Sequence, residues 1–142
     1  MIALLFGTAL ALGAPNLKDP PKDERPILGN WKLVEWLQHG TRMAFAEGTG
    51  VEFLPDGKRL WRDGPGGADE RLYKLYPKTD PAQIDLVRTD SGPQPVVHPC
   101  IFKTAGDTLV IAVGPPGGER PKQFDAKTAA MLMTFTRIKT KD

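Results

Sequence analysis

Short runs of alternating apolar and polar residues, separated by turn-forming residues, follow one another along most of the chain. Alternation with a period of two places successive side chains on opposite faces, which is typical of half-buried β-strands. No run is long enough, with the period of a helix, to organise a fold around helices. The pattern therefore predicts eight strands, over residues 30–38, 50–55, 58–63, 70–76, 83–88, 100–103, 108–113 and 131–138.

The connections between these runs predict how the strands pair. Asp56-Gly57 joins two runs as a tight hairpin, because glycine supplies the positive φ that such turns need. The prolines of residues 77–82 cannot donate to a sheet ladder, so this segment ends one strand before the next begins. A chain of hairpins leaves two sheet edges exposed, and closure into a barrel removes both. We predict an all-β fold, an eight-stranded antiparallel up-and-down barrel, with a β-sandwich as the alternative.

Alternation also predicts which side chains face the interior. A regular first strand places Glu35 on the same face as Trp31 and places Trp36 on the opposite face. A one-residue bulge would invert every assignment after it. The predicted inward sets of the other strands are Val51 with Phe53, Ile84 with Leu86, Leu109 with Ile111 and Val113, and Met133 with Phe135 and Arg137.

Composition fits a single domain with its own core. The chain has 142 residues, of which 40% are apolar and 25% charged, values ordinary for a globular protein. Its 15 glycines and 14 prolines favour short strands and many turns. The net charge of +2 is small, and basic residues are interspersed with acidic ones, so nucleic acid is not expected as a partner.

The N-terminal segment indicates export. Residues 1–14 are uncharged, apolar and end in small side chains, which is typical of a secretory signal peptide; a short apolar tail is the alternative. The run is too short to cross a bilayer, which takes about 20 residues, so no transmembrane segment is predicted. Residues 15–26 are rich in proline and charge and predict a disordered leader. The domain then covers 27–142, and we expect a periplasmic or extracellular location.

Candidate chemistry is sparse. Cys100 is the only cysteine, so no internal disulfide can form. His98 would share its face in an extended strand, which allows a thiol–imidazole pair, but a lone cysteine in a strand is more often a small buried apolar residue. His39 and His98 are the only histidines and do not show metal-ligand spacing. We predict no catalytic residue, no metal site and no cofactor.

Five residues are candidate ligand contacts. An inward Glu35 would need a partner, because burying a carboxylate is costly. That partner is either a polar or cationic ligand group or an arginine such as Arg62 or Arg71, and a slipped register is the remaining explanation. Arg120 lies in the Gly- and Pro-rich loop 114–121, which is a flexible connection, a mobile flap over a cavity mouth, or an anion site formed by glycine amides and Arg120. The other candidates are the aromatic residues Trp36, Trp61 and Tyr73, whose alternative role is core packing.

Gly29-x-Trp31 at the start of the first strand, with Arg137 near the end of the last, resembles the lipocalin and calycin signature. The resemblance implies that the tryptophan plugs the closed end of the barrel and that the arginine packs across its indole, a cation–π contact of about 0.5 to 2 kcal/mol.

A wider resemblance covers residues 27–138. The order "GNWKLVEW", "GVEFLPDGK", "PAQIDL", "AGDTLVIAV", "RPKQF" and "LMTFTR" is similar to a small lipocalin-like domain of unknown function found in planctomycete bacteria. It implies that Arg120, Pro121 and Phe124 help to close the barrel. The segment His98-Pro99-Cys100 departs from that pattern at the start of the sixth predicted strand.

Three functional hypotheses follow. The first is an exported binder of a small hydrophobic or amphipathic molecule, held in or at the mouth of the barrel. The second is a non-catalytic interaction or envelope-associated module whose barrel is filled by side chains. The third, an enzyme, has the least support because no nucleophile, acid–base pair or metal cluster stands out. We favour the binder narrowly, and the sequence makes no prediction about oligomeric state.

Overall fold

A computed structural model describes residues 26–76, 78–89 and 92–139. The predicted signal peptide, and the predicted leader up to residue 25, lie outside these residues. The described chain is all-β, and it contains no helix long and apolar enough to cross a membrane. Its strands are β1 (Gly29–Gln38), β2 (Thr41–Arg42), β3 (Gly50–Phe53), β4 (Lys58–Arg62), β5 (Ala68–Tyr76), β6 (Gln83–Arg88), β7 (Val96–Ala105), β8 (Thr108–Val113) and β9 (Met131–Arg137).

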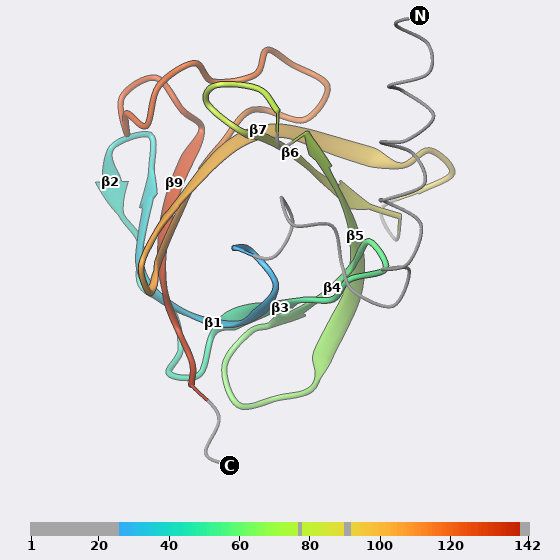
Figure 1. Cartoon of the computed structure of the whole chain (residues 1–142), viewed down its shortest axis with the longest axis vertical. Helices are drawn as coiled ribbons and strands as arrows, with labels where there is room; N and C mark the ends of the chain where they lie inside the picture. Colours follow the sequence, from blue (N-terminus) through green and yellow to red (C-terminus); the bar gives the residue numbers. More distant parts are fainter. Residues whose placement is uncertain (1–25, 77, 90–91, 140–142) are drawn as a thin grey trace, which may run out of the picture.

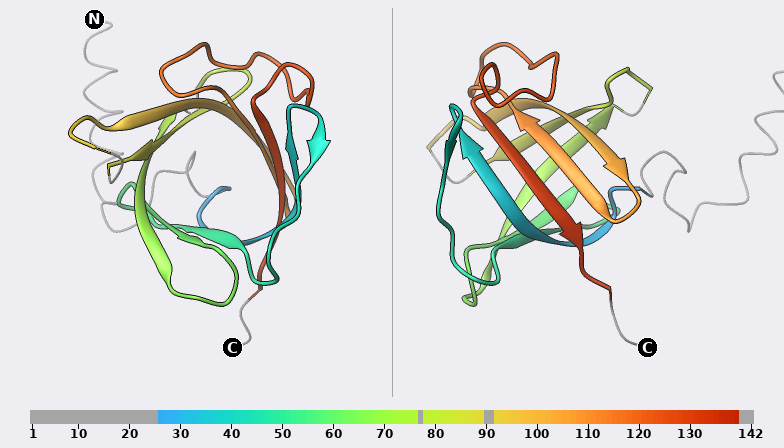
Figure 2. Two further views of the ribbon diagram at one scale, coloured as in Figure 1. Left: turned by 180° about the vertical axis from the view of Figure 1, so that it is seen from behind. Right: turned by 90° about the vertical axis from the view of Figure 1, so that its left-hand side faces the viewer.

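Eight of these strands close into an antiparallel barrel. The hydrogen-bonded order is β2-β1-β3-β4-β5-β6-β7-β8-β9, and β9 returns to pair with β1. In Figure 1 the strands follow one another around a ring, and Figure 2 shows β1, β9 and β8 side by side. The short β2 pairs only with the end of β1. The predicted up-and-down barrel is confirmed, and the alternative β-sandwich is wrong.

One end of the barrel is plugged by Trp31, as the Gly-x-Trp pattern implies. Trp31 is 0% exposed, and its Nε1 donates a hydrogen bond to the carbonyl oxygen of Ile27 at 2.8 Å. Arg137 is its direct partner on β9, with Cζ 4.2 Å from the centroid of the indole ring. The same guanidinium donates to the carbonyl oxygens of Leu28 and Pro26, both at 2.8 Å. The arginine thus ties the entering segment and the indole together.

Two glycines permit this close packing. Gly29 has φ +114, and a Cβ there would lie 3.0 Å from Nη1 of Arg137. At Gly50, a Cβ would lie 2.2 Å from the carbonyl oxygen of Trp31, where β3 passes against β1. A side chain at either position would push apart the strands or displace the guanidinium. This explains why glycine stands at the entry to the first strand.

The core follows the predicted alternation on most strands. The predicted inward residues of β3, β6, β8 and β9 are buried, with Arg137 half-buried over the plug. Tyr73 joins them near the plugged end: its ring meets Phe53 edge-on at 5.0 Å, and its hydroxyl donates to the carbonyl oxygen of Leu54. Cys100 and Phe102 are also buried. A single apolar interior therefore connects all eight barrel strands.

The prediction for the second half of β1 is wrong because the strand contains a bulge. Leu33 pairs with Phe135 and Glu35 with Thr134, so Val34 is an extra residue without a partner on β9 and is 48% exposed. After the bulge Trp36 pairs with the buried Met133. Trp36 therefore faces the interior, and Glu35 faces outward, the reverse of the assignment made from regular alternation.

One strand start and one additional strand also differ from the prediction. The sixth barrel strand, β7, begins at Val96 and includes His98-Pro99-Cys100, rather than starting at Cys100. The two-residue β2 was not predicted, because Thr41 and Arg42 are too few to show alternation and both are exposed. Neither difference changes the barrel topology.

Replacing Arg137 tests the plug. We expect Arg137→Ala to lower the free energy of unfolding by about 1 to 3 kcal/mol, because it removes the stacked guanidinium and two hydrogen bonds to the entering segment. Urea denaturation followed by tryptophan fluorescence measures this. Arg42→Ala is the matched control, since Arg42 is 77% exposed and its ion pair should contribute at most about 1 kcal/mol. Equal stability of Arg137→Ala and wild type would contradict the assigned contact.

Candidate functional site

A cavity of about 270 Å³ lies inside the barrel at the end opposite Trp31. The alternating strand directions show why it is there: most of its lining comes from the ends of β1, β4, β6 and β8 and from the beginnings of β5, β7 and β9, while Arg59 comes from the beginning of β4. These positions meet at one end of an up-and-down barrel. The apolar part of the lining is Trp36, Trp61, Leu86, Val113, Met131 and Met133, and the polar part is Arg59, Asp63, Arg71, Arg88 and His98.

The two tryptophans of the lining differ in their hydrogen bonds. Trp61 Nε1 donates a hydrogen bond to Oδ1 of Asp63 at 3.0 Å, two residues further along the chain. Trp36 reaches the cavity only because of the bulge at Val34, and its buried Nε1 has no hydrogen-bond acceptor among the described residues. A buried donor without an acceptor costs about 1 to 3 kcal/mol. An acceptor atom inside the cavity would remove that cost.

Three arginines lie at the same level of the barrel wall. Arg59 of β4 is directly opposite Arg71 of β5, and Leu72 opposite Val87 places Arg71 next to Arg88 of β6 in the same register. Arg59 is 4% exposed, and its Nε donates to the carbonyl oxygen of Leu72 at 3.0 Å. Arg71 Nη2 lies 3.7 Å from Oδ2 of Asp69, and its Cζ lies 5.8 Å from the centroid of the Trp61 ring.

The electrostatic environment of Arg59 is unfavourable for its charge. Burial lowers its pKa from 12.5 to about 10, and the neighbouring charges of Arg71 and Arg88 act in the same direction. At neutral pH the guanidinium is still protonated. The wall therefore carries three positive charges close together, with Arg59 almost fully removed from water.

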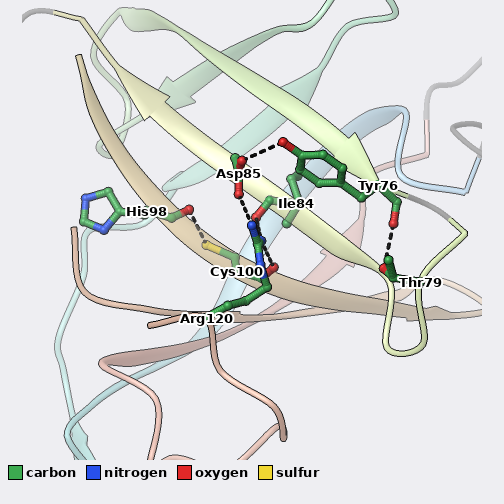
Figure 3. Close-up of polar contacts among 7 residues, drawn as sticks. All are labelled: Tyr76, Thr79, Ile84, Asp85, His98, Cys100 and Arg120. Atoms are coloured by element: carbon green, nitrogen blue, oxygen red, sulfur yellow. Dashed lines mark hydrogen bonds and ion pairs between the residues drawn. The ribbon is translucent and has the colours of Figure 1, made fainter. Parts of the chain in front are cut away.

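His98 and Cys100 do not form a catalytic pair. The Sγ of Cys100 donates to the main-chain oxygen of His98 at 3.2 Å, and in Figure 3 the imidazole points away from the sulfur. The ring instead uses Nδ1 against the carbonyl oxygen of Gly114 at 3.2 Å, which fixes its orientation in the cavity wall. Burial raises the pKa of the Cys100 thiol from 9.0 to about 12, so the thiol is neutral at physiological pH.

Arg120 fastens the loop 114–121 to the outside of the β6–β7 pair (Figure 3). Its Nη1 donates to the carbonyl oxygens of Cys100 and Ile84, at 2.8 and 3.3 Å, and its Nη2 lies 2.7 Å from Oδ1 of Asp85. Tyr76 completes the cluster by donating its hydroxyl to Oδ2 of Asp85 at 3.0 Å. The guanidinium is thus occupied by contacts within the fold. Two more open hollows, of about 510 and 490 Å³, lie beside it and outside the barrel interior.

The structure separates the five candidate ligand contacts. Trp36 and Trp61 lie together in the cavity lining, whereas Tyr73 packs near the plugged end. Glu35 lies outside the barrel in an ion pair with Arg42 at 2.8 Å, so a structural pairing after a register slip explains it, with a different arginine from those expected. Arg62 donates instead to Oδ1 of Asn30 at 2.7 Å. No group of three or more His, Cys, Asp or Glu residues in the described part of the chain could hold a metal ion.

Arg59, Arg71 and Arg88 together form what we call the arginine wall. The sequence did contain a signal for it, which the prediction missed. Arg59, Arg71 and Arg88 each lie two residues from an inward-facing side chain of the same strand, Trp61, Tyr73 and Leu86 respectively. Period-two alternation therefore places all three inward. Of the three, the prediction named only Arg71, as a possible partner of an inward Glu35, and it assigned no face to Arg59 or Arg88.

Comparisons with protein-family models, with curated proteins and with solved structures find no match to this chain.

The state of Cys100 can be tested by thiol labelling. At pH 8 the raised pKa leaves about a thousandfold less thiolate than a thiol of pKa 9.0 would have. We expect slow reaction with Ellman's reagent in the native protein and rapid reaction in guanidinium chloride. Because folding raises the pKa of the thiol, stability also depends on pH. The contribution of the neutral thiol to stability is complete below pH 9 and is lost as the pH rises towards 12. Rapid labelling of the native protein would contradict this burial.

The role of Arg120 in the fold can be tested by substitution. Arg120→Met removes the ion pair with Asp85 and the donors to two carbonyl oxygens, and we expect it to lower the free energy of unfolding by about 1 to 3 kcal/mol. Lys122→Met, which removes an 87% exposed side chain directly after this loop, should change little. Denaturant unfolding of both variants measures the difference, and equal stability would show that the Arg120 contacts do not hold the loop.

Proposed function

We propose that this protein binds one small hydrophobic or amphipathic molecule inside the open end of its barrel. The observation that carries the proposal is the cavity of about 270 Å³ opposite the Trp31 plug. A barrel of eight strands has room for one small ligand, and its mouth is a common binding site. Pockets for drug-sized ligands begin at about 300 Å³, so the occupant should be compact.

The lining has the composition of a binding site. Two tryptophans and two methionines supply large apolar contact surfaces, and methionine adapts readily to irregular ligand shapes. A few polar groups converge on the same space, including the Trp36 N–H, which has no acceptor in the described part of the chain. Such a mixture favours the binder over an interaction module, because the latter requires an interior filled by side chains.

We further propose that the chain is a lipocalin-like, calycin-type domain similar to the planctomycete domain of unknown function, and that it is exported. The barrel, Gly29 at the entry and Arg137 on Trp31 support the family proposal. The apolar residues 1–14 support export to the periplasm or the cell exterior.

Native mass spectrometry of the protein purified from its own host tests the proposed function. We expect a retained small molecule on the wild type. Met133→Trp should lose it, because Met133 lines the cavity on β9 and a larger ring would occupy part of the available volume.

Thr134→Trp is the matched control, since it adds the same ring to the neighbouring residue of β9, which pairs with the outward-facing Glu35. This variant should retain the molecule. An occupant that survives Met133→Trp, or a wild type that carries no molecule and takes up none of a set of small aromatic compounds, would overturn the proposal.

A further inference from the structure

The arginine wall places like charges directly opposite one another. Arg59 and Arg71 are cross-strand partners on β4 and β5, and Arg88 continues the row on β6. Like charges opposite each other on one face of an antiparallel sheet are destabilising. Here all three line the same cavity, so their charges act on one small volume.

Two carboxylates of the described residues, Asp63 and Asp69, lie near this row. Asp63 is the one carboxylate among the described residues of the cavity lining, and it accepts a hydrogen bond from Trp61. Asp69 lies 3.7 Å from Arg71 but is largely exposed to solvent, where an ion pair contributes little. Arg59, the most deeply buried of the three, has an uncharged main-chain oxygen as its hydrogen-bond acceptor. Among the described lining residues, three arginines therefore share the cavity with one carboxylate.

We infer that the cavity selects an amphipathic organic anion, whose acidic group lies against Arg59, Arg71 and Arg88 and whose apolar body lies against Trp36, Trp61 and Met133. This inference rests on the proposed function and specifies its ligand class. A guanidinium offers paired donors that match a carboxylate, and hydrogen bonds between charged groups are the stronger ones. An anion would also relieve the repulsion within the row, which burial intensifies, since burial already lowers the pKa of Arg59 to about 10.

The cavity sets the size of the ligand body. At about 270 Å³, it admits a fused aromatic ring pair or a similar compact group rather than a long lipid chain. The two tryptophan rings favour stacking with an aromatic body. His98, also in the lining, adds one more hydrogen-bonding group on the side of β7.

Three isosteric probes test the inference: 2-naphthoate, the neutral 2-naphthamide and the cationic 2-naphthylmethylammonium ion. Calorimetric titration of the full chain measures the Kd of each. We expect the carboxylate to bind at least about tenfold more tightly than the amide, since one charged hydrogen bond contributes about 1.5 to 3 kcal/mol and 1.4 kcal/mol corresponds to tenfold. The ammonium ion should bind most weakly.

Substitutions test whether the arginine row causes the preference for the carboxylate over the amide. Arg59→Met should weaken carboxylate binding at least about tenfold and leave amide binding within about threefold. Arg88→Met is the second variant, in case the more buried substitution impairs folding. Arg42→Met is the control, because it removes the same charge from the exposed outer surface and should change neither Kd.

Stability separates a ligand-binding role from a structural one. If the arginine row serves ligand binding, the melting temperature of ligand-free Arg59→Met should equal or exceed that of the wild type. The reason is that the substitution removes a buried charge that is repelled by its neighbours. A structural arginine would give a lower melting temperature together with unchanged probe affinities, and that result would overturn the inference.

The probes also distinguish the two proposals. If the amide binds as tightly as the carboxylate, and Met133→Trp blocks both, the anion inference is overturned while the binding function stands. If no probe binds and the protein from its host carries no molecule, both are overturned. Selective binding of the carboxylate that is lost in Arg59→Met or Arg88→Met supports both.

Discussion

The contact between Arg137 and Trp31 is the interaction on which the rest of the structure depends. It joins the last strand to the first, and the guanidinium also binds Leu28, 109 residues earlier in the chain. Closing such a long loop costs conformational entropy, which the β1–β9 ladder and the buried indole must offset. Because Arg137 holds the entering segment across the barrel end, the same contact closes the sheet and plugs one of its mouths. Without the pairing of β1 with β9 beside this contact, the barrel would be a sheet with two exposed edges.

Plugging one end determines where a ligand can be held. The indole of Trp31 and the aromatic pair of Phe53 and Tyr73 fill the interior near the plugged end, and the cavity of about 270 Å³ lies towards the other mouth. The bulge at Val34 then turns Trp36 inward at that level, next to Met133. One extra residue thus places a second large aromatic ring in the cavity wall. The inward-facing side chains of β1 therefore have two roles: Trp31 closes one end of the barrel, and Trp36 lines the cavity.

The features that follow from local periodicity could be predicted from the sequence, and those that depend on one irregular residue could not. The eight barrel strands, the inward sets such as Leu109 with Ile111, and the pairing of Trp31 with Arg137 all rest on alternation or on a motif. Glu35 was placed on the wrong face because nothing in "LVEW" distinguishes a bulged strand from a regular one, and the inversion depends on pairing with β9. The arginine wall lies between these cases: alternation implies it, but the predicted inward sets covered neither 58–63 nor 70–76 and stopped at Leu86 in the strand 83–88.

The distribution of favourable and unfavourable interactions along the barrel supports a functional reason for the row of arginines. At the plugged end, the guanidinium of Arg137 has an aromatic ring and main-chain acceptors, so its charge is well accommodated. At the open end Arg59 is buried among like charges, and a neutral apolar side chain would suit that position better in a protein selected for stability alone. Natural sequences depart from local rules mainly at functional sites. One fold therefore uses arginine in opposite ways: at one end to complete the barrel, and at the other in an arrangement that an anion would stabilise.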